Sequence, residues 1–354
     1  MTMRIHQMTA TLSPGDAIGN YVLTLRRIFA ELGVAGDIFA DHVHPALSHL
    51  WKPSSEYRPT GHDVLWFHYS IGADNFRSLE NNPDRLVMDF HGVTPPHLIE
   101  HHELRRLAQQ ALEALPNYAD RFRLCIVHSD AGRGMLVANG YGRLEKVPYV
   151  VDSAHLTGVE DMTLSCLLSR LRYLLFVGRI VANKGILDLV QVFGHIKRWR
   201  PNLKLMLVGD TTLMPGYVSQ VEAMIQRLGL TDDVLLTGKV PDEMLVSFYR
   251  HAALLVTLSE HEMFGVPVIE SLYYGVPVVC NDVPALREAA GEAGMVVQAK
   301  RHLEAAQAIH ALLEDRERYE QLRAAGRVRA LQFMPEMLRA RIHTLLPLIV
   351  GENA

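Results

Sequence analysis

Short apolar runs of strand type alternate with amphipathic stretches from one end of the chain to the other. In the first half, helical periodicity covers residues 18–32 and 97–115. The runs of strand type in this half cover residues 4–9, 37–40, 64–68, 86–90, 124–128 and 144–147. This alternation predicts parallel sheets wrapped by helices, which is an α/β fold.

The second half opens with a continuous apolar run, from Tyr173 to Val177, that ends at Gly178. This pattern is typical of a buried parallel strand that delivers a loop to a ligand. Further strands are predicted at residues 203–208, 234–236, 253–258, 276–280 and 295–297. The stretch from 150 to 172 contains acidic residues, serine and glycine, so we predict a hinge there, with a domain boundary near residue 152.

The C-terminal part of the chain is predicted to be helical. A long helical stretch covers residues 301–332, Pro335 interrupts the pattern, and a final helix runs from about residue 336 to 350. We therefore expect a first domain at 1–152, a second at 153–333 and a terminal segment at 334–354.

Length and composition restrict the class of protein. A chain of 354 residues is too long for one ordinary domain of about 100 to 200 residues. With 49% hydrophobic and 21% charged residues it is typical of globular protein, and its net charge of -4 gives no reason to expect a nucleic-acid partner. Cys125, Cys166 and Cys280 are widely spaced, which favours a reducing compartment. Since the sequence has neither a signal-like start nor an apolar run of ~18 residues, we expect a cytoplasmic protein.

The stretch from Ser259 to Glu270 carries the clearest chemistry. It follows the apolar strand at 253–258 and opens a helix, where Gly265 lets the backbone approach a ligand and free N–H groups attract an anion such as phosphate. Glu262 and Glu270 lie before and inside this helix, and carboxylates bind hydroxyls rather than phosphate. A glutamate pair at this spacing also occurs on solvated helix faces, so the surrounding residues matter. A sugar nucleotide would satisfy both the acids and the helix end.

Two basic residues follow the first strand of the second domain. Arg179 and Lys184 occur in the string Gly-Arg-x4-Lys-Gly, and both could converge on a diphosphate, although surface charge is the ordinary interpretation. Together they could neutralise a leaving group without a metal. The chain has no Asp-x-Asp pair to hold a divalent cation, so we expect neither a metal nor another cofactor.

Five motifs in order resemble the retaining GT-B glycosyltransferases of family GT4, also described as glycosyl transferases group 1. They are Gly-Arg-x4-Lys-Gly, Leu-Val-Gly, Thr-Gly-x-Val, Glu-x7-Glu and Gly-Val-Pro-Val-Val. The resemblance implies two Rossmann-like domains, the first for the acceptor and the second for the nucleotide-sugar donor. It also implies that the C-terminal helix crosses back to pack on the first domain.

Carried over to this sequence, the resemblance assigns roles to the charged residues. Glu262 would meet the donor sugar, Glu270 the ribose hydroxyls, and Arg179 and Lys184 the diphosphate. The sugar would keep its anomeric configuration by same-face attack, with the departing phosphate oxygen helping to take the acceptor's proton. No protein nucleophile or metal would then be required.

The resemblance also assigns main-chain contacts to the donor. Phe264 and Gly265 would add backbone donors, and the loop that ends at Val240 would hold the base, which leaves UDP-, GDP-, ADP- and dTDP-sugars all open. The acceptor would be a glycan or a lipid-linked glycan at the cytoplasmic face of the membrane. The basic segment 101–123 could touch an anionic membrane there, or could simply be solvated.

Three residues of the first domain enter through the same resemblance. Gly15 lies in the family's glycine loop after the first strand, facing the diphosphate, although this loop lacks the commoner double glycine and Gly15 could be only a turn former. Asp16 would repel phosphate, so it contacts sugar or acceptor or is a helix cap. His91 occupies the segment that brings a histidine to the donor sugar, and its alternative is a structural histidine.

Other interpretations remain open from the sequence. His97, Glu100 and His101 match an inverted zinc-peptidase pattern, in which two histidines four apart on a helix share a metal, but the pattern is short and a polar helix face explains these residues better. Within the same fold, a sugar-nucleotide epimerase or hydrolase would need no acceptor. A non-catalytic subunit that binds nucleotide sugars is the third candidate, and the intact charged residues argue against it.

Overall fold

The computed structural model describes residues 3–151 and 158–351, which form two compact units. The first unit contains the described residues up to Val151 together with those from Phe333 onward, and the second extends to Gln332. The predicted domain boundary near residue 152 lies outside the described residues.

The first unit is built on a seven-stranded sheet in the order β3-β2-β1-β4-β5-β6-β7, in which every pair is parallel. Its strands are β1 (Ile5–Leu12), β2 (Ile38–Val43), β3 (Trp51–Pro53), β4 (Val64–Tyr69), β5 (Arg85–Phe90), β6 (Leu124–Val127) and β7 (Leu144–Lys146). Strands β4, β5 and β6 are buried on both faces, which explains their continuous apolar runs.

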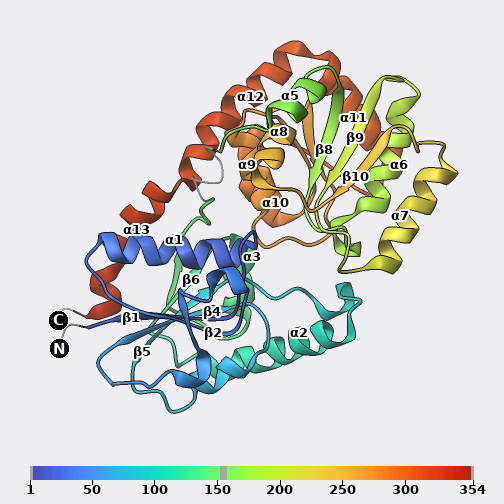
Figure 1. Cartoon of the computed structure of the whole chain (residues 1–354). Coiled ribbons are helices and arrows are strands. Elements are labelled where there is room, and N and C mark those ends of the chain that lie inside the picture. The colour runs from blue at the N-terminus through green and yellow to red at the C-terminus, as the bar shows by residue number, and fades with distance from the viewer. Residues whose placement is uncertain (1–2, 152–157, 352–354) are drawn as a thin grey trace. The chain divides into compact units, whose positions relative to one another are not determined.

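Helices cover the faces of this sheet (Figure 1). They are α1 (Ala17–Glu31), α2 (His102–Ala114), α3 (Asp130–Ala138) and α13 (Pro335–Val350). Short 3-10 segments lie in the connections at Pro45–Leu47, Ser54–Glu56, Asp74–Leu79, Pro96–Leu98 and Leu115–Tyr118.

The second unit has a six-stranded parallel sheet in the order β10-β9-β8-β11-β12-β13. Its strands are β8 (Arg172–Val177), β9 (Leu203–Val208), β10 (Val234–Gly238), β11 (Leu254–Thr257), β12 (Val278–Asn281) and β13 (Gly294–Val297). The strand order reverses between β8 and β11, which is the arrangement of a doubly wound sheet.

The helices of the second unit pack around this sheet and bury their apolar faces against it (Figure 1). They are α5 (Met162–Leu168), α6 (Ile186–Lys197), α7 (Pro215–Arg227), α8 (Asp242–His251), α9 (Val266–Tyr273), α10 (Pro284–Ala290), α11 (His302–Glu314) and α12 (Arg316–Ala330). Leu174, Phe176 and Ile186 are among the fully buried residues of the core.

Two predicted helices differ from the structure, and a short strand was missed. The helix expected at 97–115 begins only at His102, because Pro96 to Leu98 form a 3-10 turn and His101 caps the helix. The helical stretch 301–332 is two helices, since Asp315 leaves the helical conformation and accepts a hydrogen bond from the N–H of Arg318. Strand β3 was not predicted, because three residues ending in proline give no periodic signal.

The C-terminal helix α13 belongs to the first unit, as the family resemblance of the sequence implied. It contacts β5 and buries Leu338, Ile342, Leu345 and Ile349 at helical spacing. Leu348 lies on its solvent side and is 56% exposed, although its carbonyl accepts a hydrogen bond from Arg123 at 2.8 Å. The helix therefore packs on the first unit through one apolar stripe, and polar contacts lie at its edges.

We expect Ile342→Ala to lower the free energy of unfolding of the first unit by about 2–5 kcal/mol, because the side chain is fully buried and its removal leaves a cavity. Hydrogen exchange of the β5 amides would report this unit separately from the other. Leu348→Ala, on the exposed side of the same helix, is the matched control and should change the value by less than about 0.5 kcal/mol. Equal losses in the two variants would contradict the packing described here.

Candidate functional site

The carboxyl ends of β8 and β11 meet at the switch point of the second sheet. These strands are neighbours although they are not consecutive in the chain, and ligands of open α/β sheets bind beside the loops that follow such a pair. The loop after β8 carries Arg179 and Lys184, and the loop after β11 carries Glu262. The sheet topology thus brings together groups that lie about 80 positions apart in sequence.

Lys184 and Glu262 form an ion pair at this edge. Lys184 closes a 3-10 turn, and its Nζ lies 2.5 Å from Oε1 of Glu262. The two side chains are 17% and 16% exposed, so both are partly desolvated and both remain reachable from solvent. The structure therefore brings these two predicted residues together.

Backbone contacts hold the two loops in register. Gly185 has φ +66, and a Cβ there would lie 2.2 Å from the carbonyl oxygen of Leu258 at the end of β11. The carbonyl of Asn183 accepts a hydrogen bond from the N–H of Glu260 at 2.9 Å. Only glycine combines this left-handed conformation with so close an approach, so Gly185 fixes where Lys184 lies.

Helix α9 begins directly after the Glu262 loop. Gly265 is its N-cap, with φ +84, and because it has no side chain no side-chain oxygen caps the first turn. Phe264, one residue earlier, is half-buried, and Pro267 occupies the first turn, where its missing N–H costs nothing. The first-turn N–H groups and the helix dipole create a positive potential at this end.

Glu270 lies inside α9 and is only 6% exposed. Its Oε2 accepts a hydrogen bond from the hydroxyl of Tyr249 on α8 at 2.5 Å. Burial, and then the neighbouring Glu270, raise the pKa of Tyr249 far above its ordinary value, so this hydroxyl stays a donor. Tyr249 also stacks on Tyr274, with ring centroids 5.5 Å apart. The tyrosine orients one carboxylate oxygen of Glu270, a contact that the sequence did not predict.

A second group of charges lies at the ends of β8, β9 and β10. Hydrogen bonds from Thr212, and then the charges of Lys239 and Arg179, hold the pKa of Asp210 below its ordinary value. Arg179 and Lys239 are exposed. The half-buried Val240 follows Lys239 after β10, so the predicted base loop lies along the same edge of the sheet as Arg179.

In the first unit, Gly15 and Asp16 form the turn between β1 and α1. Gly15 has φ +73, and its N–H donates to Oδ1 of Asn20 at 3.3 Å. Asp16 is the N-cap of α1, with its Oδ2 accepting from the N–H of Gly19 at 3.1 Å. Asp16 thus has the helix-capping contact that the sequence allowed.

His91 lies directly after β5 in a buried cluster with two other histidines and an aspartate. Its Nε2 lies 2.9 Å from Nδ1 of His68 on β4 and 3.8 Å from Oδ1 of Asp89. Nε2 of His128, which follows β6, lies 2.7 Å from Oδ1 of Asp89. The four side chains come from three adjacent strands and are between 0% and 4% exposed.

Burial decides the protonation of this cluster. It lowers the pKa of His68 to about 3, with a further contribution from His128, and it lowers the pKa of His91 well below its ordinary value. Burial alone would raise the pKa of Asp89, but His128 and then His91 outweigh it, and the pKa of Asp89 is lowered. His68 and His91 are therefore neutral near pH 7, while Asp89 is ionised.

The predicted zinc pattern does not form on a helix. His97 lies in a 3-10 turn, Glu100 follows it, and His101 is the N-cap of α2, where its Nδ1 accepts from the N–H of Leu104. The premise of two histidines four apart on one helix is therefore wrong. Within the described residues, the set of ligand-type atoms close enough to share a metal is that of His68, Asp89 and His91.

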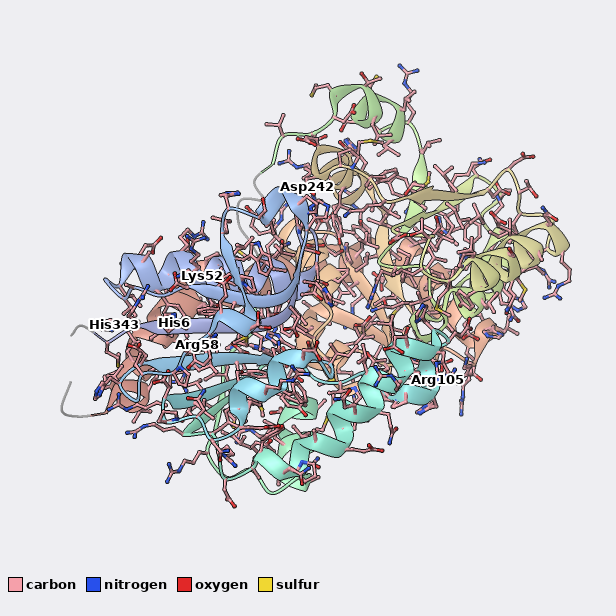
Figure 2. The ribbon with its side chains drawn as sticks, turned by 60° about the horizontal axis from the view of Figure 1, so that its bottom comes forward. His6, Lys52, Arg58, Arg105, Asp242 and His343 are labelled. Atoms are coloured by element: carbon pink, nitrogen blue, oxygen red, sulfur yellow. The ribbon has the colours of Figure 1, made fainter. Side chains whose placement is uncertain are left out.

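The basic segment 101–123 is engaged in local contacts. Arg105 projects from α2 (Figure 2), and its Nε donates to the carbonyl of Ile99 at 2.7 Å. Arg106 pairs with Glu103 one turn away, at 2.6 Å. Among the described helices, none combines the length and the apolar character needed to cross a bilayer.

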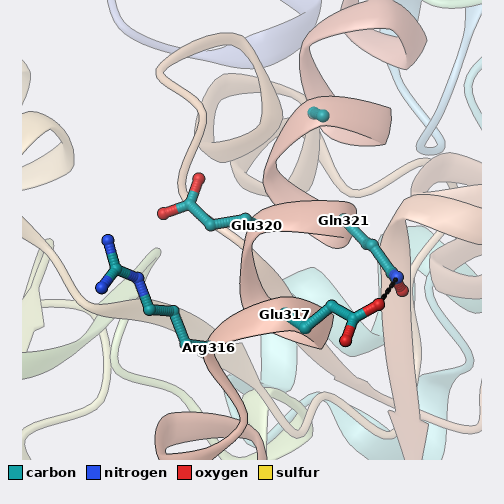
Figure 3. A pocket seen from close by; sticks show the side chains of 5 residues that line it. Arg316, Glu317, Glu320 and Gln321 are labelled. Carbon is teal, nitrogen blue, oxygen red and sulfur yellow. Dashed lines mark hydrogen bonds between the residues drawn. The ribbon is translucent and has the colours of Figure 1, made fainter.

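Figure 3 shows a hollow on α12 that is separate from the residues above. It is lined by Arg316, Glu317, Glu320, Gln321 and Ala324. All of them come from a single helix, and Gln321 donates to Glu317 at 3.2 Å. Because ligand sites need polar groups that converge from several elements, this hollow is not the candidate site.

The neutral histidines predict a pH-dependent stability of the first unit. A buried histidine with a lowered pKa is neutral in the folded state but takes up a proton in the unfolded state below about pH 6.5, so its stabilising effect is present above that pH and is lost as the pH falls. Each such histidine should reduce the free energy of unfolding by about 1.4 kcal/mol per pH unit.

We therefore expect His68→Gln to flatten the pH dependence of β5 amide exchange between pH 6 and 5. His343→Gln is the control, because it removes an exposed histidine of α13 (Figure 2) and should leave the pH dependence unchanged. If wild type and His68→Gln had the same slope, His68 would not be a neutral buried group.

Comparisons with known proteins agree with this architecture. Residues 168–329 match the family described as "Glycosyl transferases group 1". The lipopolysaccharide 1,2-N-acetylglucosaminetransferase of Salmonella typhimurium is 30% identical over 185 residues, which cover 50% of this chain and 43% of that protein. The alpha-D-kanosaminyltransferase of Streptomyces kanamyceticus is 30% identical over 150 residues, 42% of this chain and 38% of that protein. The chain thus spans less than half the length of these curated relatives.

A solved structure matches nearly the whole chain. Anabaena HepE in complex with UDP-glucose superposes with a TM-score of 0.77 at 19% identity, covering 98% of this chain and 99% of that one. The two parallel sheets of seven and six strands, with α13 returning to the first unit, are thus those of the GT-B fold. Residues 168–329 match the glycosyl transferases group 1, and the chain as a whole has the GT-B fold of two Rossmann-like domains.

Proposed function

We propose that this protein is a glycosyltransferase that takes its sugar from a nucleotide-sugar donor bound at the switch point of the second unit. The observation that carries the proposal is the Lys184–Glu262 pair, which lies beside the uncapped N-terminus of α9. A cation and helix N–H groups suit a diphosphate, and a carboxylate suits the hydroxyls of the attached sugar.

The ion pair is suited to exchange partners when a donor binds. A diphosphate carries more negative charge than one carboxylate, so it competes for the ammonium of Lys184. Glu262 would then accept hydrogen bonds from sugar hydroxyls. Arg179, which is exposed at the end of β8, adds a second cation on the phosphate side.

The proposed chemistry is a substitution at the anomeric carbon. The bond from that carbon to the phosphate oxygen breaks, a bond to the acceptor oxygen forms, and the acceptor's proton passes to the departing phosphate. Lys184 and Arg179 stabilise the negative charge that grows on the leaving group. We propose retention of configuration without a metal, because the two cations can supply the neutralisation that a divalent ion would provide.

Glu270 is proposed to bind the ribose hydroxyls. Tyr249 occupies one of its oxygens, and the helix holds the carboxylate in place. The base would contact the main chain near Val240, and Phe264 and Gly265 would donate N–H groups to the diphosphate. In the first unit, His91 and the turn at Gly15 and Asp16 are proposed to serve the sugar and the diphosphate.

The comparisons support a UDP-linked donor and a glycan acceptor. HepE was solved with UDP-glucose, and the Salmonella relative is named as acting in lipopolysaccharide. We further propose that the enzyme is cytoplasmic, acts on a glycan or lipid-linked acceptor, and contacts the membrane peripherally through the 101–123 segment. A thermal-shift panel of UDP-, GDP-, ADP- and dTDP-sugars tests the donor, since ligands that bind the native state raise its melting temperature.

We expect Lys184→Ala to reduce the turnover number about a hundredfold or more, because the leaving group loses a cation. The donor for this assay is the nucleotide sugar that raises the melting temperature in the thermal-shift panel. Its melting temperature without ligand should change little, since the pair lies at the sheet edge. Lys204→Ala, which removes a cation that pairs with Asp233 at 2.7 Å in the same unit, is the matched control. Full activity in Lys184→Ala would end the proposed phosphate role.

Tyr249→Phe should raise the KM for the donor several-fold, because Glu270 loses the hydrogen bond that orients its carboxylate. The turnover number should change less, since the ribose lies away from the bond that breaks. Tyr319→Phe removes a hydroxyl that donates to the carbonyl of Ala253 and serves as the control. A Tyr249→Phe enzyme with the wild-type KM would show that Glu270 does not need this contact.

A further inference from the structure

A chain of hydrogen bonds runs from helix α1 through Gln7 to His68. Nε2 of Gln7 donates to the carbonyl oxygen of Val22 at 3.1 Å. Because a carbonyl oxygen can only accept, the NH2 group of Gln7 faces Val22, and its Oε1 faces Nε2 of His68 at 3.0 Å. Nε2 of His68 must therefore carry a hydrogen.

The same reasoning continues from His68 to His91. Burial lowers the pKa of His68 to about 3, so the ring is neutral and its Nδ1 carries a lone pair. Nε2 of His91 lies 2.9 Å from this atom and so carries the hydrogen of the contact. Burial also keeps His91 neutral, which leaves a lone pair on its Nδ1.

Nδ1 of His91 is the last atom in this series of hydrogen bonds. It is buried, and no donor within the described part of the protein reaches it. A buried acceptor without a donor is unfavourable, and such atoms are uncommon in folded proteins unless they serve a ligand or hold a water. The polar atom at the end of the relay therefore requires a hydrogen-bond donor, and a hydroxyl group is one of suitable size.

Neighbouring contacts hold the other two members of the cluster, His128 and Asp89, in place. Nδ1 of His128 lies 2.9 Å from the carbonyl of Val147 and must donate to it, while its Nε2 lies 2.7 Å from Asp89. Trp66 donates to the other oxygen of Asp89 at 2.8 Å, so the carboxylate is held in place. Among the described residues, the rings of Tyr21 and Tyr149 also contact the ring of His91.

We propose that Gln7 and His68 are positioning residues that fix His91 in the Nε2–H tautomer and so present its Nδ1 lone pair to a hydroxyl of the sugar ligand. The identity of that ligand rests on the proposed function. The tautomer does not, because it follows from the acceptors at Val22 and Gln7 together with the buried, neutral ring of His68.

The spacing favours protons over a metal in this cluster. Two imidazole nitrogens bound to one tetrahedral zinc at about 2.0–2.1 Å would be separated by about 3.3 Å. The His68–His91 separation of 2.9 Å is that of a hydrogen bond. Stoichiometric zinc in the purified chain, measured by mass spectrometry and lost in His68→Gln, would overturn the relay.

The tautomer can be measured on the full chain without any ligand. Histidine labelled with 15N gives distinct long-range 15N–1H patterns for the two neutral tautomers, and His91→Asn assigns the signals. We expect the Nε2–H pattern for His68 and His91 between pH 8 and 6. Gln7→Leu removes the acceptor and should let part of the population move to the Nδ1–H form, whereas Gln7→Glu keeps an acceptor oxygen and should retain the Nε2–H form.

Activity supplies the second measurement. Gln7→Leu should raise the KM for the donor about tenfold, as expected for one hydrogen bond, with a smaller change in kcat. Gln7→Glu should restore part of the loss. Thr9→Val, which removes a buried hydroxyl of similar environment from the same strand, is the matched control and should change neither tautomer nor KM.

The outcomes separate this proposal from the proposed function. A wild-type Nδ1–H tautomer of His91, or an unchanged spectrum in Gln7→Leu, overturns the relay even if sugar transfer is observed. The expected tautomers in a chain that binds and turns over no nucleotide sugar support the relay and overturn the proposed function. Because the wild-type spectrum alone decides the tautomer, a Gln7→Leu chain that fails to fold does not remove the test.

Discussion

The adjacency of β8 and β11 is the constraint on which the candidate site depends. Because these parallel strands are neighbours without being consecutive, the loops that follow them meet at one edge of the sheet although they are far apart in sequence. Gly185 lets the first loop touch the end of β11, and the contact from Asn183 to Glu260 holds the second loop beside it. The Lys184–Glu262 pair is possible only because both loops are anchored in this way.

Most of the fold could be predicted because its strands are short, apolar and buried on both faces. A short apolar run such as Tyr173 to Val177, placed between regular helical stretches, is best interpreted as a buried strand. The elements that were missed or merged lack that signal. Strand β3 is three residues long, and the break at Asp315 between α11 and α12 contains neither glycine nor proline. Capping by a side chain, rather than a breaker residue, ends that pattern.

The residues of the candidate site likewise fall into those that the sequence reveals and those that only the packing reveals. Glu262, Lys184 and Gly265 belong to motifs that are local in sequence, so their spacing reveals them. Tyr249 was not foreseeable, because its contact with Glu270 depends on how α8 packs beside α9. The partners of His91 were hidden for a related reason: with 18 histidines in the chain, only the register of β4 against β5 shows that His68 is the neighbour.

The two units handle polar groups by different physics. At the edge of the second sheet, Lys184 and Glu262 form an ion pair that is still partly exposed to solvent, so a charged ligand can reach either partner. In the first unit, His68 and His91 have almost no solvent and are neutral. They therefore offer hydrogen-bond donors and acceptors in fixed orientations, but no charge. A sugar nucleotide needs both, since its diphosphate is recognised by charge and its hydroxyls by the orientation of donors and acceptors. Under the proposed function, a neutral acceptor at His91 would select among sugar hydroxyls without attracting the diphosphate, whereas a charged imidazolium would attract it.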